Sequence, residues 1–215
     1  MASPEKTFRV GVICGSTRSP RAGPQITEFV HKTIETHLLK PQDTTSNAPA
    51  PAITLEPVDI AAFHLPLFDE PGIPKAITDR PAGYAHQHTR DWSARVAALD
   101  AFVFVTPQYN WGIPAGLKNA IDYLFHEWTG KPAMIVSYGG HGGDKAAGAL
   151  GTVLQGLRMR TPGGTVNLSF PDREFAGKCF VGEDLGLMEE GSEVWVKDRE
   201  DIVAVWEEMS GMLSE

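Results

Sequence analysis

The chain has 215 residues, of which 42% are hydrophobic and 21% are charged, a composition that can bury a core and excludes global disorder. Its net charge of −8 disfavours nucleic-acid binding, which needs clustered positive charge. The two cysteines, Cys14 and Cys179, are too few for a disulfide framework or a cysteine-rich zinc site. No apolar run reaches 18 residues and no signal peptide precedes Gly11, so we expect a cytoplasmic protein without a membrane partner.

Hydrophobic patterning predicts one domain over residues 1–215 in which strands and helices alternate. Short apolar runs predict buried strands at 8–14, 53–60, 101–106, 133–136 and 165–170. Apolar residues at helical spacing predict helices over 24–38, 88–99, 117–128, 146–157 and 202–209. The proline-rich, aperiodic stretch 41–52 predicts a flexible surface insertion. We expect the tail beyond about residue 170 to complete the sheet and to end in a helix.

Strands that show little alternation between their two faces, each followed by a helix, predict a parallel sheet covered by helices on both sides. Five such strands fit an α/β fold, the flavodoxin-like doubly wound sheet with strand order 2-1-3-4-5. Ligands of such sheets bind beyond the carboxyl ends of the strands, at the switch point. The loops after the first, third and fourth strands are therefore the candidate site.

The loop after the first strand combines small residues, hydroxyl side chains and two guanidinium groups with the start of a helix. Backbone N–H groups, the helix dipole and arginine all favour an anion, so this loop is a candidate phosphate site. A polar capping loop with solvated arginines is the alternative interpretation. Neither G-x-x-x-x-G-K-[ST] nor G-x-G-x-x-G is present, which disfavours a Walker-type NTPase and a dinucleotide fold. The candidate phosphate-binding residues are Ser16, Thr17, Arg18, Arg21, Ala22 and Gly23.

The loops after the third and fourth strands carry aromatic residues and glycines. Tyr109 and Trp111 are placed to line a slot for a flat ring, although packing against the next helix is the alternative. The glycines let backbone N–H groups approach a ligand closely, whereas we expect His141 to be a solvated loop residue rather than an acid or base. With the phosphate loop, these residues describe a mononucleotide site that fits FMN. The ring-binding candidates are Pro107, Gln108, Tyr109, Asn110, Trp111, Ser137, Tyr138, Gly139, Gly140 and His141.

Four segments between about Val10 and Leu157 resemble the NADPH-dependent FMN reductase family, and within it the fungal NAD(P)H:quinone reductases: GSTRSPRAGPQI, DIAAFHLPLFDEP, TPQYNWGIPAGLKNAIDYLFHEW and KPAMIVSYGGHGG. The resemblance implies that the first loop holds the FMN phosphate and that the other two loops hold the isoalloxazine. Two departures stand out. Many members have Glu where this chain has Gln108, and some have Ser or Thr where it has Ala22 and Gly23, so the phosphate depends more on backbone N–H groups.

The same resemblance implies an enzyme that moves two electrons from NADPH or NADH through bound FMN to a quinone or similar small acceptor in a ping-pong cycle. Hydride passes to flavin N5, so no catalytic side chain and no metal are expected. The backbone N–H groups of Gly139, Gly140 and His141 would stabilise the reduced ring. Family members form homodimers, and the apolar side chains of Leu124, Phe125 and Trp128 fit either such an interface or the core.

Three alternative functions remain compatible with parts of the sequence. A flavodoxin-like electron carrier would bind FMN without turning over nicotinamide. A serine hydrolase built on Ser16 or Ser137 with His141 lacks a G-x-S-x-G elbow. A metal module built on His86 and His88 is disfavoured because residues two apart do not share a helix face. The physiological acceptor and the preference between NADH and NADPH are not readable from the sequence.

Overall fold

The computed structural model describes residues 6–40 and 52–214, so the insertion expected at 41–52 lies outside it except for Ala52. Its five strands form one parallel sheet in the order β2-β1-β3-β4-β5, which confirms the expected fold class. The strands are β1 (Phe8–Cys14), β2 (Ile53–Asp59), β3 (Ala101–Pro107), β4 (Ala133–Gly139) and β5 (Val166–Ser169). Every residue of β3 is buried, because helices cover both faces of the sheet at its centre.

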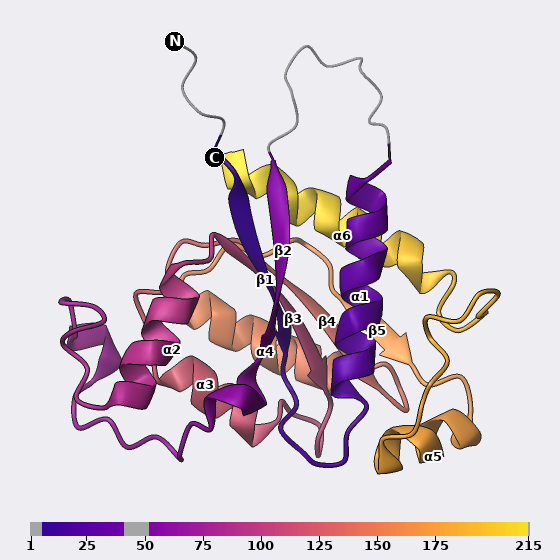
Figure 1. Ribbon diagram of the computed structural model, residues 1–215, viewed down its shortest axis with the longest axis horizontal. Coiled ribbons are helices and arrows are strands. Elements are labelled where there is room, and N and C mark those ends of the chain that lie inside the picture. The colour runs from indigo at the N-terminus through magenta and orange to yellow at the C-terminus, as the bar shows by residue number, and fades with distance from the viewer. Residues whose placement is uncertain (1–5, 41–51, 215) are drawn as a thin grey trace, which may run out of the picture.

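Helices form a layer on each face of the sheet (Figure 1). α1 (Gly23–Leu38) and α6 (Asp198–Gly211) cover one face, and α2 (Gln87–Ala97), α3 (Ala115–Asp122) and α4 (Asp144–Gly156) cover the other. Successive β3 side chains serve the two cores in turn: Val103 packs with α1 and α6, whereas Phe102 and Phe104 pack with α2, α3 and α4. The short α5 (Arg173–Val181) lies beyond β5, at the carboxyl edge of the sheet.

The third helix is shorter than its apolar spacing predicts, since α3 ends at Asp122 rather than at Trp128. The residues that follow leave the helix and still fill the core, where Leu124 and Trp128 are each 1% exposed. Continued burial explains why the apolar spacing outlasts the helix. These two side chains are therefore unavailable for a dimer contact, and the homodimer itself stays a prediction.

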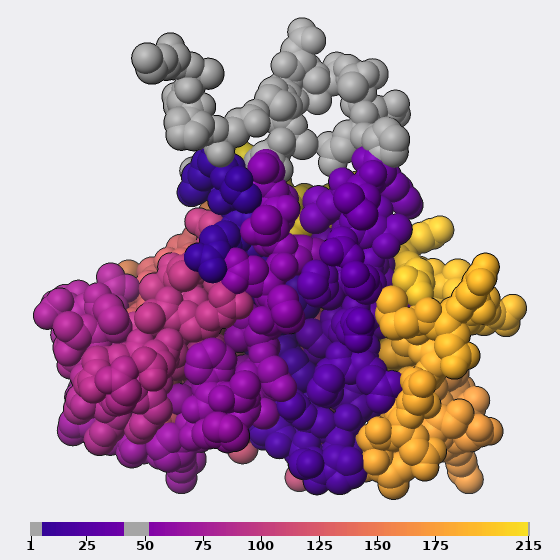
Figure 2. All heavy atoms as spheres, viewed as in Figure 1, coloured from indigo at the N-terminus to yellow at the C-terminus, as the bar shows by residue number. Residues whose placement is uncertain are grey.

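The tail does not complete the sheet as expected, because the fifth strand already ends at Ser169. It adds α5 and α6 instead and packs beside α1, as the orange and yellow surface in Figure 2 shows. We did not predict α5, whose buried residues are only Phe175 and Cys179. Its end signals are nevertheless present: the Asp172 carboxylate accepts a hydrogen bond from the Phe175 N–H, and Gly182 ends the helix with φ = 73°.

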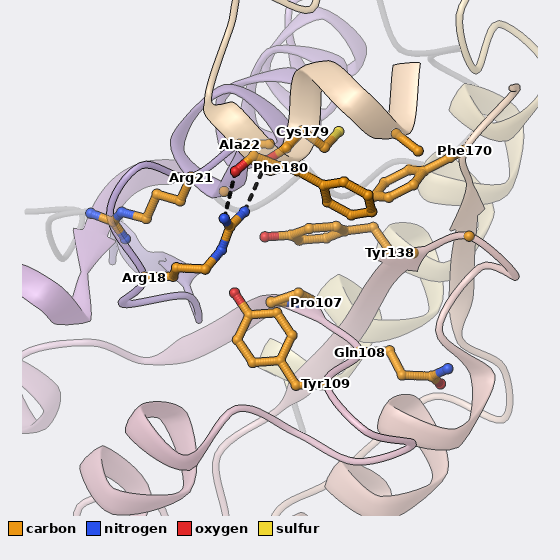
Figure 3. Close-up of a pocket in the computed structure, with 14 residues that line it drawn as sticks. Arg18, Arg21, Ala22, Pro107, Gln108, Tyr109, Tyr138, Phe170, Cys179 and Phe180 are labelled. Carbon is orange, nitrogen blue, oxygen red and sulfur yellow. Dashed lines mark hydrogen bonds between the residues drawn. The ribbon is translucent and has the colours of Figure 1, made fainter. Parts of the chain in front are cut away.

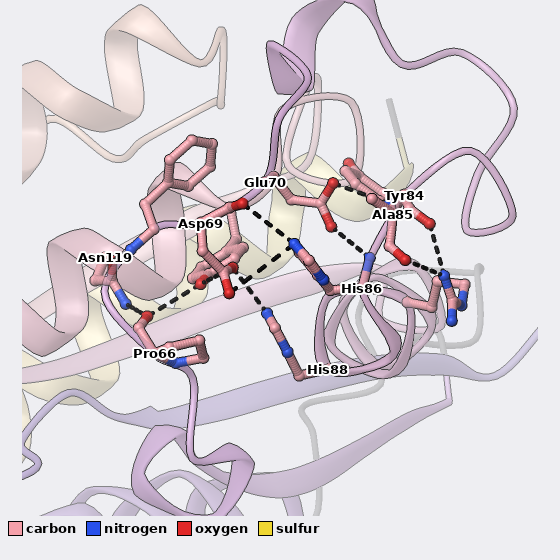
Figure 4. A network of polar contacts seen from close by, with 11 residues as sticks. Pro66, Asp69, Glu70, Tyr84, Ala85, His86, His88 and Asn119 are labelled. Atoms are coloured by element: carbon pink, nitrogen blue, oxygen red, sulfur yellow. Dashed lines mark hydrogen bonds and ion pairs between the residues drawn. The ribbon is translucent and has the colours of Figure 1, made fainter.

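The segment between β2 and α2 contains two 3₁₀ turns (Ile60–Phe63 and Pro74–Ala76) and is fastened by two carboxylates (Figure 4). The buried Glu70 accepts the N–H groups of Ala85 and His86 at 2.9 Å each, at the start of α2. Asp69 Oδ1 accepts the Tyr123 hydroxyl at 2.8 Å and lies 3.0 Å from His88 Nε2. Burial raises the pKa of both carboxyl groups, but their hydrogen-bond donors outweigh this effect. The pKa of Asp69 and that of Glu70 therefore lie below their ordinary values.

The helix-face argument about His86 and His88 was wrong, because His86 has an extended backbone and precedes α2 as its N-cap. Their rings stack with centroids 5.2 Å apart, and both lie beside Asp69. Across residues 6–40 and 52–214, no three His, Cys, Asp or Glu side chains are grouped so that they could hold a metal ion. In the same part of the chain, no helix is long and apolar enough to cross a membrane.

An ion cluster ties β1, β2 and α2 together at the end of the sheet opposite the candidate site. Glu56 of β2 accepts hydrogen bonds from Arg9 of β1 and from Arg95 of α2. These bonds, with that from Arg9 foremost, lower the pKa of Glu56 to about 2. A carboxyl group with a lowered pKa stabilises the fold above its ordinary pKa, and this stabilisation is lost as the pH falls through the folded-state value.

We expect Glu56→Gln to reduce the free energy of unfolding by about 1–3 kcal/mol at pH 7. The difference from the wild type should shrink as the pH falls from 5 towards 3, because the wild-type carboxylate then becomes protonated more readily in the unfolded state than in the folded one. Urea unfolding at pH 7, 5 and 3 measures both effects. Glu174→Gln is the control, since that side chain is 82% exposed. A difference that stays constant over this range would contradict the charge interaction.

Candidate functional site

A cavity of about 410 Å³ opens at the carboxyl edge of the sheet (Figure 3). Four chain segments line it: the β1–α1 loop, the β3–α3 loop, the β4–α4 loop and the stretch from β5 through α5. Ten of the residues expected from the sequence are among the lining, namely Arg18, Arg21, Ala22, Gly23, Pro107, Gln108, Tyr109, Tyr138, Gly139 and Gly140. Four lining residues were missed, namely Phe170, Ala176, Cys179 and Phe180.

The β1–α1 loop presents free backbone donors at the start of α1. The N-cap residue Ala22 offers no capping side chain, and within the described residues the N–H groups of 16–19 and 21–23 donate no hydrogen bond, Pro20 having none. Gly23 allows this shape because an alanine Cβ would overlap Ser16 Oγ, whose side chain is tucked under the helix and only 1% exposed. Unpaired N–H groups at a helix N-terminus form an anion site.

Arg21 is one of the cavity-lining residues, and its guanidinium group braces this loop. Its Nη1 donates to Asp59 Oδ1 at 3.0 Å and to the Ser16 carbonyl, and its Nη2 donates to Asp59 Oδ2 at 2.5 Å. The hydrogen bond with Asp59 raises the pKa of Arg21 above its usual value. The charged end of Arg21 is thus paired with Asp59 of β2 and positions the loop, and its role as a direct phosphate ligand stays a prediction.

Arg18 points the opposite way and crosses the cavity to α5. Its Nη1 donates to the Phe180 carbonyl at 2.6 Å and its Nη2 donates to the Cys179 carbonyl at 2.9 Å (Figure 3). These are carbonyls of the last turn of α5, where a helix lacks internal donors. Arg18 therefore joins the anion loop to the tail, and its contact with a phosphate stays a prediction. Thr17 and Ser16 do not line the cavity.

The β3–α3 loop divides its residues between the cavity and a tight turn. Tyr109 and Gly112 exchange two backbone hydrogen bonds of 2.9 Å, which closes a two-residue turn at Asn110 and Trp111. Both turn residues have positive φ, 47° and 63°, as this kind of turn requires. Neither Asn110 nor Trp111 lines the cavity, and Trp111 is 75% exposed, so their contact with a planar ring stays a prediction.

Gln108 connects this loop to the next helix. Its Oε1 accepts the N–H groups of Lys145 and Ala146 at 3.0 and 3.2 Å. The residue at the N-cap position of α4, Gly143, has no side chain to do this. The amide of Gln108 thus caps α4 from a neighbouring loop and aligns the β3–α3 and β4–α4 loops along one rim.

The β4–α4 loop turns at Gly142 and Gly143, whose φ angles are 76° and 84°. Gly140 has no such positive φ, and a Cβ there would meet no atom within 4 Å. Ser137 does not line the cavity either: its Oγ lies 2.8 Å from both the Gly142 carbonyl and Asn167 Oδ1, inside the loop. The N–H groups of Gly140 and His141 donate no hydrogen bond within the described chain.

The side chain of His141 is exposed and does not line the cavity. Neither Ser137 nor Ser16 forms a hydrogen bond with any histidine in the described residues, because Ser16 Oγ lies 3.6 Å from Cys14 Sγ and Ser137 is engaged as above. A serine hydrolase needs a nucleophile within hydrogen-bond reach of its base. The geometry of the site therefore disfavours a serine hydrolase.

Aromatic rings form the apolar walls of the cavity. Tyr138 is 4% exposed, its ring centroid lies 6.4 Å from that of Phe170, and burial raises the pKa of its hydroxyl. In Figure 3, Phe170 and Phe180 lie on one side of the Tyr138 ring, and Pro107 and Tyr109 lie on the other. The cavity thus joins flat apolar surfaces to an anion loop.

The missed wall residues had a weak signal in the sequence. Phe170 directly follows the fifth strand, so the rule that ligands bind beyond strand ends applies to it as well. Ala176, Cys179 and Phe180 belong to α5, whose helix-capping residues could have marked it. Burial raises the pKa of the Cys179 thiol to about 11, so this wall stays uncharged at neutral pH.

Comparisons with known proteins identify the family of this chain. The family model described as NADPH-dependent FMN reductase matches residues 8–171. The NAD(P)H-dependent FMN reductase LOT6 of Saccharomyces cerevisiae is 48% identical over 159 residues, which cover 73% of this chain and 78% of the relative. The NAD(P)H-dependent FMN reductase ntnL of Nectria sp. is 34% identical over 209 residues, covering 96% of this chain and 98% of the relative.

A solved structure supports the fold independently. The flavoenzyme NAD(P)H:(acceptor) oxidoreductase FerB of Paracoccus denitrificans superposes with a TM-score of 0.64, covering 95% of this chain and 98% of its own. At 19% sequence identity, this likeness concerns the fold alone. The family model and the two sequence relatives carry the assignment further: the chain belongs to the NADPH-dependent FMN reductase family and is an NAD(P)H-dependent oxidoreductase of that family.

Proposed function

We propose that this protein binds FMN without a covalent bond and moves two electrons from NADPH or NADH to a quinone or similar small planar acceptor. The observation that carries the proposal is the junction of an anion loop with an apolar, flat-walled cavity at one end of the sheet. FMN combines an anionic phosphate with a planar ring, so the chemistry of the site fits both of its ends.

The phosphate would bind at the unpaired N–H groups of residues 16–19 and 21–23, at the positive end of α1. Arg21 and Asp59 hold these groups in place through the Ser16 carbonyl. The ring system would lie against Pro107, Tyr109, Gly139 and Gly140. When bound, FMN supplies the two-electron redox chemistry, and the protein supplies binding, orientation and electrostatics.

Reduction of a flavin adds negative charge to its ring, and the protein must stabilise that charge. The N–H groups of Gly140 and His141 have no partner in the described chain, and Gly140 lines the cavity. Donors that are already oriented need no rearrangement when charge develops, so they favour the reduced state. This role belongs to the backbone and not to the exposed His141 side chain.

The first test is the absorbance spectrum of the purified protein. We expect the yellow colour of bound FMN, or stoichiometric uptake of added FMN in the micromolar range, followed by rapid anaerobic bleaching with NADPH or NADH. A quinone should then restore the oxidised spectrum. Bound FMN that nicotinamide does not bleach would favour the electron-carrier alternative, and a protein that binds no FMN would refute the proposal.

The second test concerns Gly23. Gly23→Ala should weaken FMN affinity about 10-fold or more and cost about 1–3 kcal/mol of stability, because its Cβ displaces Ser16 and the loop donors with it. Gly148→Ala in α4 is the matched control, since a Cβ there meets no atom within 4 Å. FMN fluorescence titration and thermal unfolding measure both effects. Equal FMN affinity in the two variants would show that the β1–α1 loop does not bind FMN.

The third test compares Gly140 with His141. Gly140→Val puts a branched side chain into open space at the cavity rim, so it should slow reduction by NAD(P)H or lower the reduction potential of bound FMN. His141→Ala keeps the backbone donor and should change the rate only about 2- to 5-fold, since side chains whose charge stays solvated contribute little. Stopped-flow reduction of FMN-loaded variants decides between them. Loss of reduction in His141→Ala with a normal Gly140→Val would identify a side-chain acid or base.

A further inference from the structure

One wall of the cavity lies outside the part of the chain that the family model matches. That match ends at residue 171, whereas α5 spans Arg173–Val181 and supplies Ala176, Cys179 and Phe180 to the lining. We propose that α5 is the wall that selects the electron acceptor and that Arg18 is the residue that positions this wall. The selecting role of α5 rests on the proposed function. The acceptor that α5 favours is a flat, apolar quinone of more than one ring.

The inner side of α5 is held by the core. Phe175 and Cys179 are 6% and 3% exposed, one helical turn apart. The Phe175 ring lies 5.6 Å from the Phe170 ring and 5.3 Å from the Trp195 ring, centroid to centroid. These contacts hold one side of the helix as far as Cys179, whereas Phe180 and Val181 at its end are exposed.

The backbone of the last turn of α5 is also held by the loop that carries the anion site. Arg18 donates to the carbonyls of Cys179 and Phe180, as described above. Just beyond the helix, Gln25 exchanges two hydrogen bonds of 2.9 Å with the backbone of Glu183 and Leu185. Residues 18–25 therefore hold residues 179–185 at several points.

Close approach between the two segments depends on a glycine. Gly182 has φ = 73°, and a Cβ there would lie 3.0 Å from Pro20 Cβ and 3.1 Å from the backbone nitrogen of Arg21. The absence of a side chain at Gly182 lets the end of α5 rest directly on the anion loop. A shift in the backbone of that loop would therefore displace the end of α5.

The chemistry of Arg18 suits this positioning role. The C-terminus of a helix carries partial negative charge and unpaired carbonyls. A guanidinium group offsets the charge and donates hydrogen bonds to the carbonyls. Its planar fork reaches two neighbouring carbonyls at once, which the single ammonium of a lysine does less well. Only two of its N–H donors are used by α5, and its side chain also lines the cavity.

Phe180 is the residue of α5 that a ligand would meet first. It is 63% exposed although it is aromatic, and it lies on the same side of the cavity as Phe170, opposite Pro107 and Tyr109 (Figure 3). An exposed ring gains free energy when a ligand covers it, in proportion to the apolar area removed from water. A two-ring quinone covers more of Phe180 than a one-ring quinone does, so the wall favours the larger acceptor.

The acceptor arm of the test uses Phe180→Ala in the full-length, FMN-loaded protein. We expect the KM for a naphthoquinone to rise about 10-fold more than the KM for benzoquinone, with the FMN dissociation constant changed less than about 3-fold. Val181→Ala is the matched control, because Val181 is its neighbour, is 55% exposed and does not line the cavity. An unchanged KM ratio, or a large loss of FMN affinity instead, would overturn the selecting role of α5.

The positioning arm measures amide hydrogen exchange without FMN, so it does not depend on the proposed function. Arg18→Ala should speed exchange in residues 176–185 about 10-fold relative to α2, with Arg18→Lys in between. Unchanged exchange in Arg18→Ala would refute the positioning role. If the wild-type protein binds no FMN, the proposed function and the acceptor role both fail, whereas the exchange result still decides whether Arg18 positions α5.

Discussion

A parallel sheet covered on both faces is the constraint on which the rest of this structure depends. The central strands β1, β3 and β4 are largely buried, and parallel neighbours need a crossover connection, so the chain returns through a helix and begins every new strand at the same end of the sheet. All carboxyl ends therefore meet at one edge, and so do the loops that follow them. Residues 16, 107, 138 and 170, which are far apart in the chain, become neighbours for this reason alone.

Within that edge, the protein uses its long polar side chains to hold backbone in place. Arg21 is paired with Asp59, Gln108 caps α4, and Ser137 closes the glycine loop. What remains open towards the cavity is mostly backbone N–H and apolar surface. Such a site has its donors oriented before the ligand arrives, which is the arrangement that favours charge stabilisation at low reorganisation cost.

Local patterning was sufficient for the sheet order, four of the five predicted helices at close to their observed extent, and the three loops that meet at the cavity. It could not assign the roles of the two arginines, because each depends on a distant partner: Arg21 pairs with a residue 38 positions away, and Arg18 with carbonyls 161 and 162 positions away. Trp111 was placed in the slot on its type alone. The two-residue turn that points it outward is a matter of backbone angles, which residue type alone does not reveal.

That turn also gives the protein an optical property. All five tryptophans lie in the described residues, and four of them, Trp92, Trp128, Trp195 and Trp206, are at most 6% exposed. Trp111 alone is accessible to water, with the Lys145 ammonium 6.0 Å from its ring. Its emission should be the red-shifted, acrylamide-quenchable part of the intrinsic fluorescence. The molecule thus carries a native fluorophore in the same β3–α3 loop that contributes Pro107, Gln108 and Tyr109 to its cavity, and the signal of this fluorophore is separable from that of the core without any label.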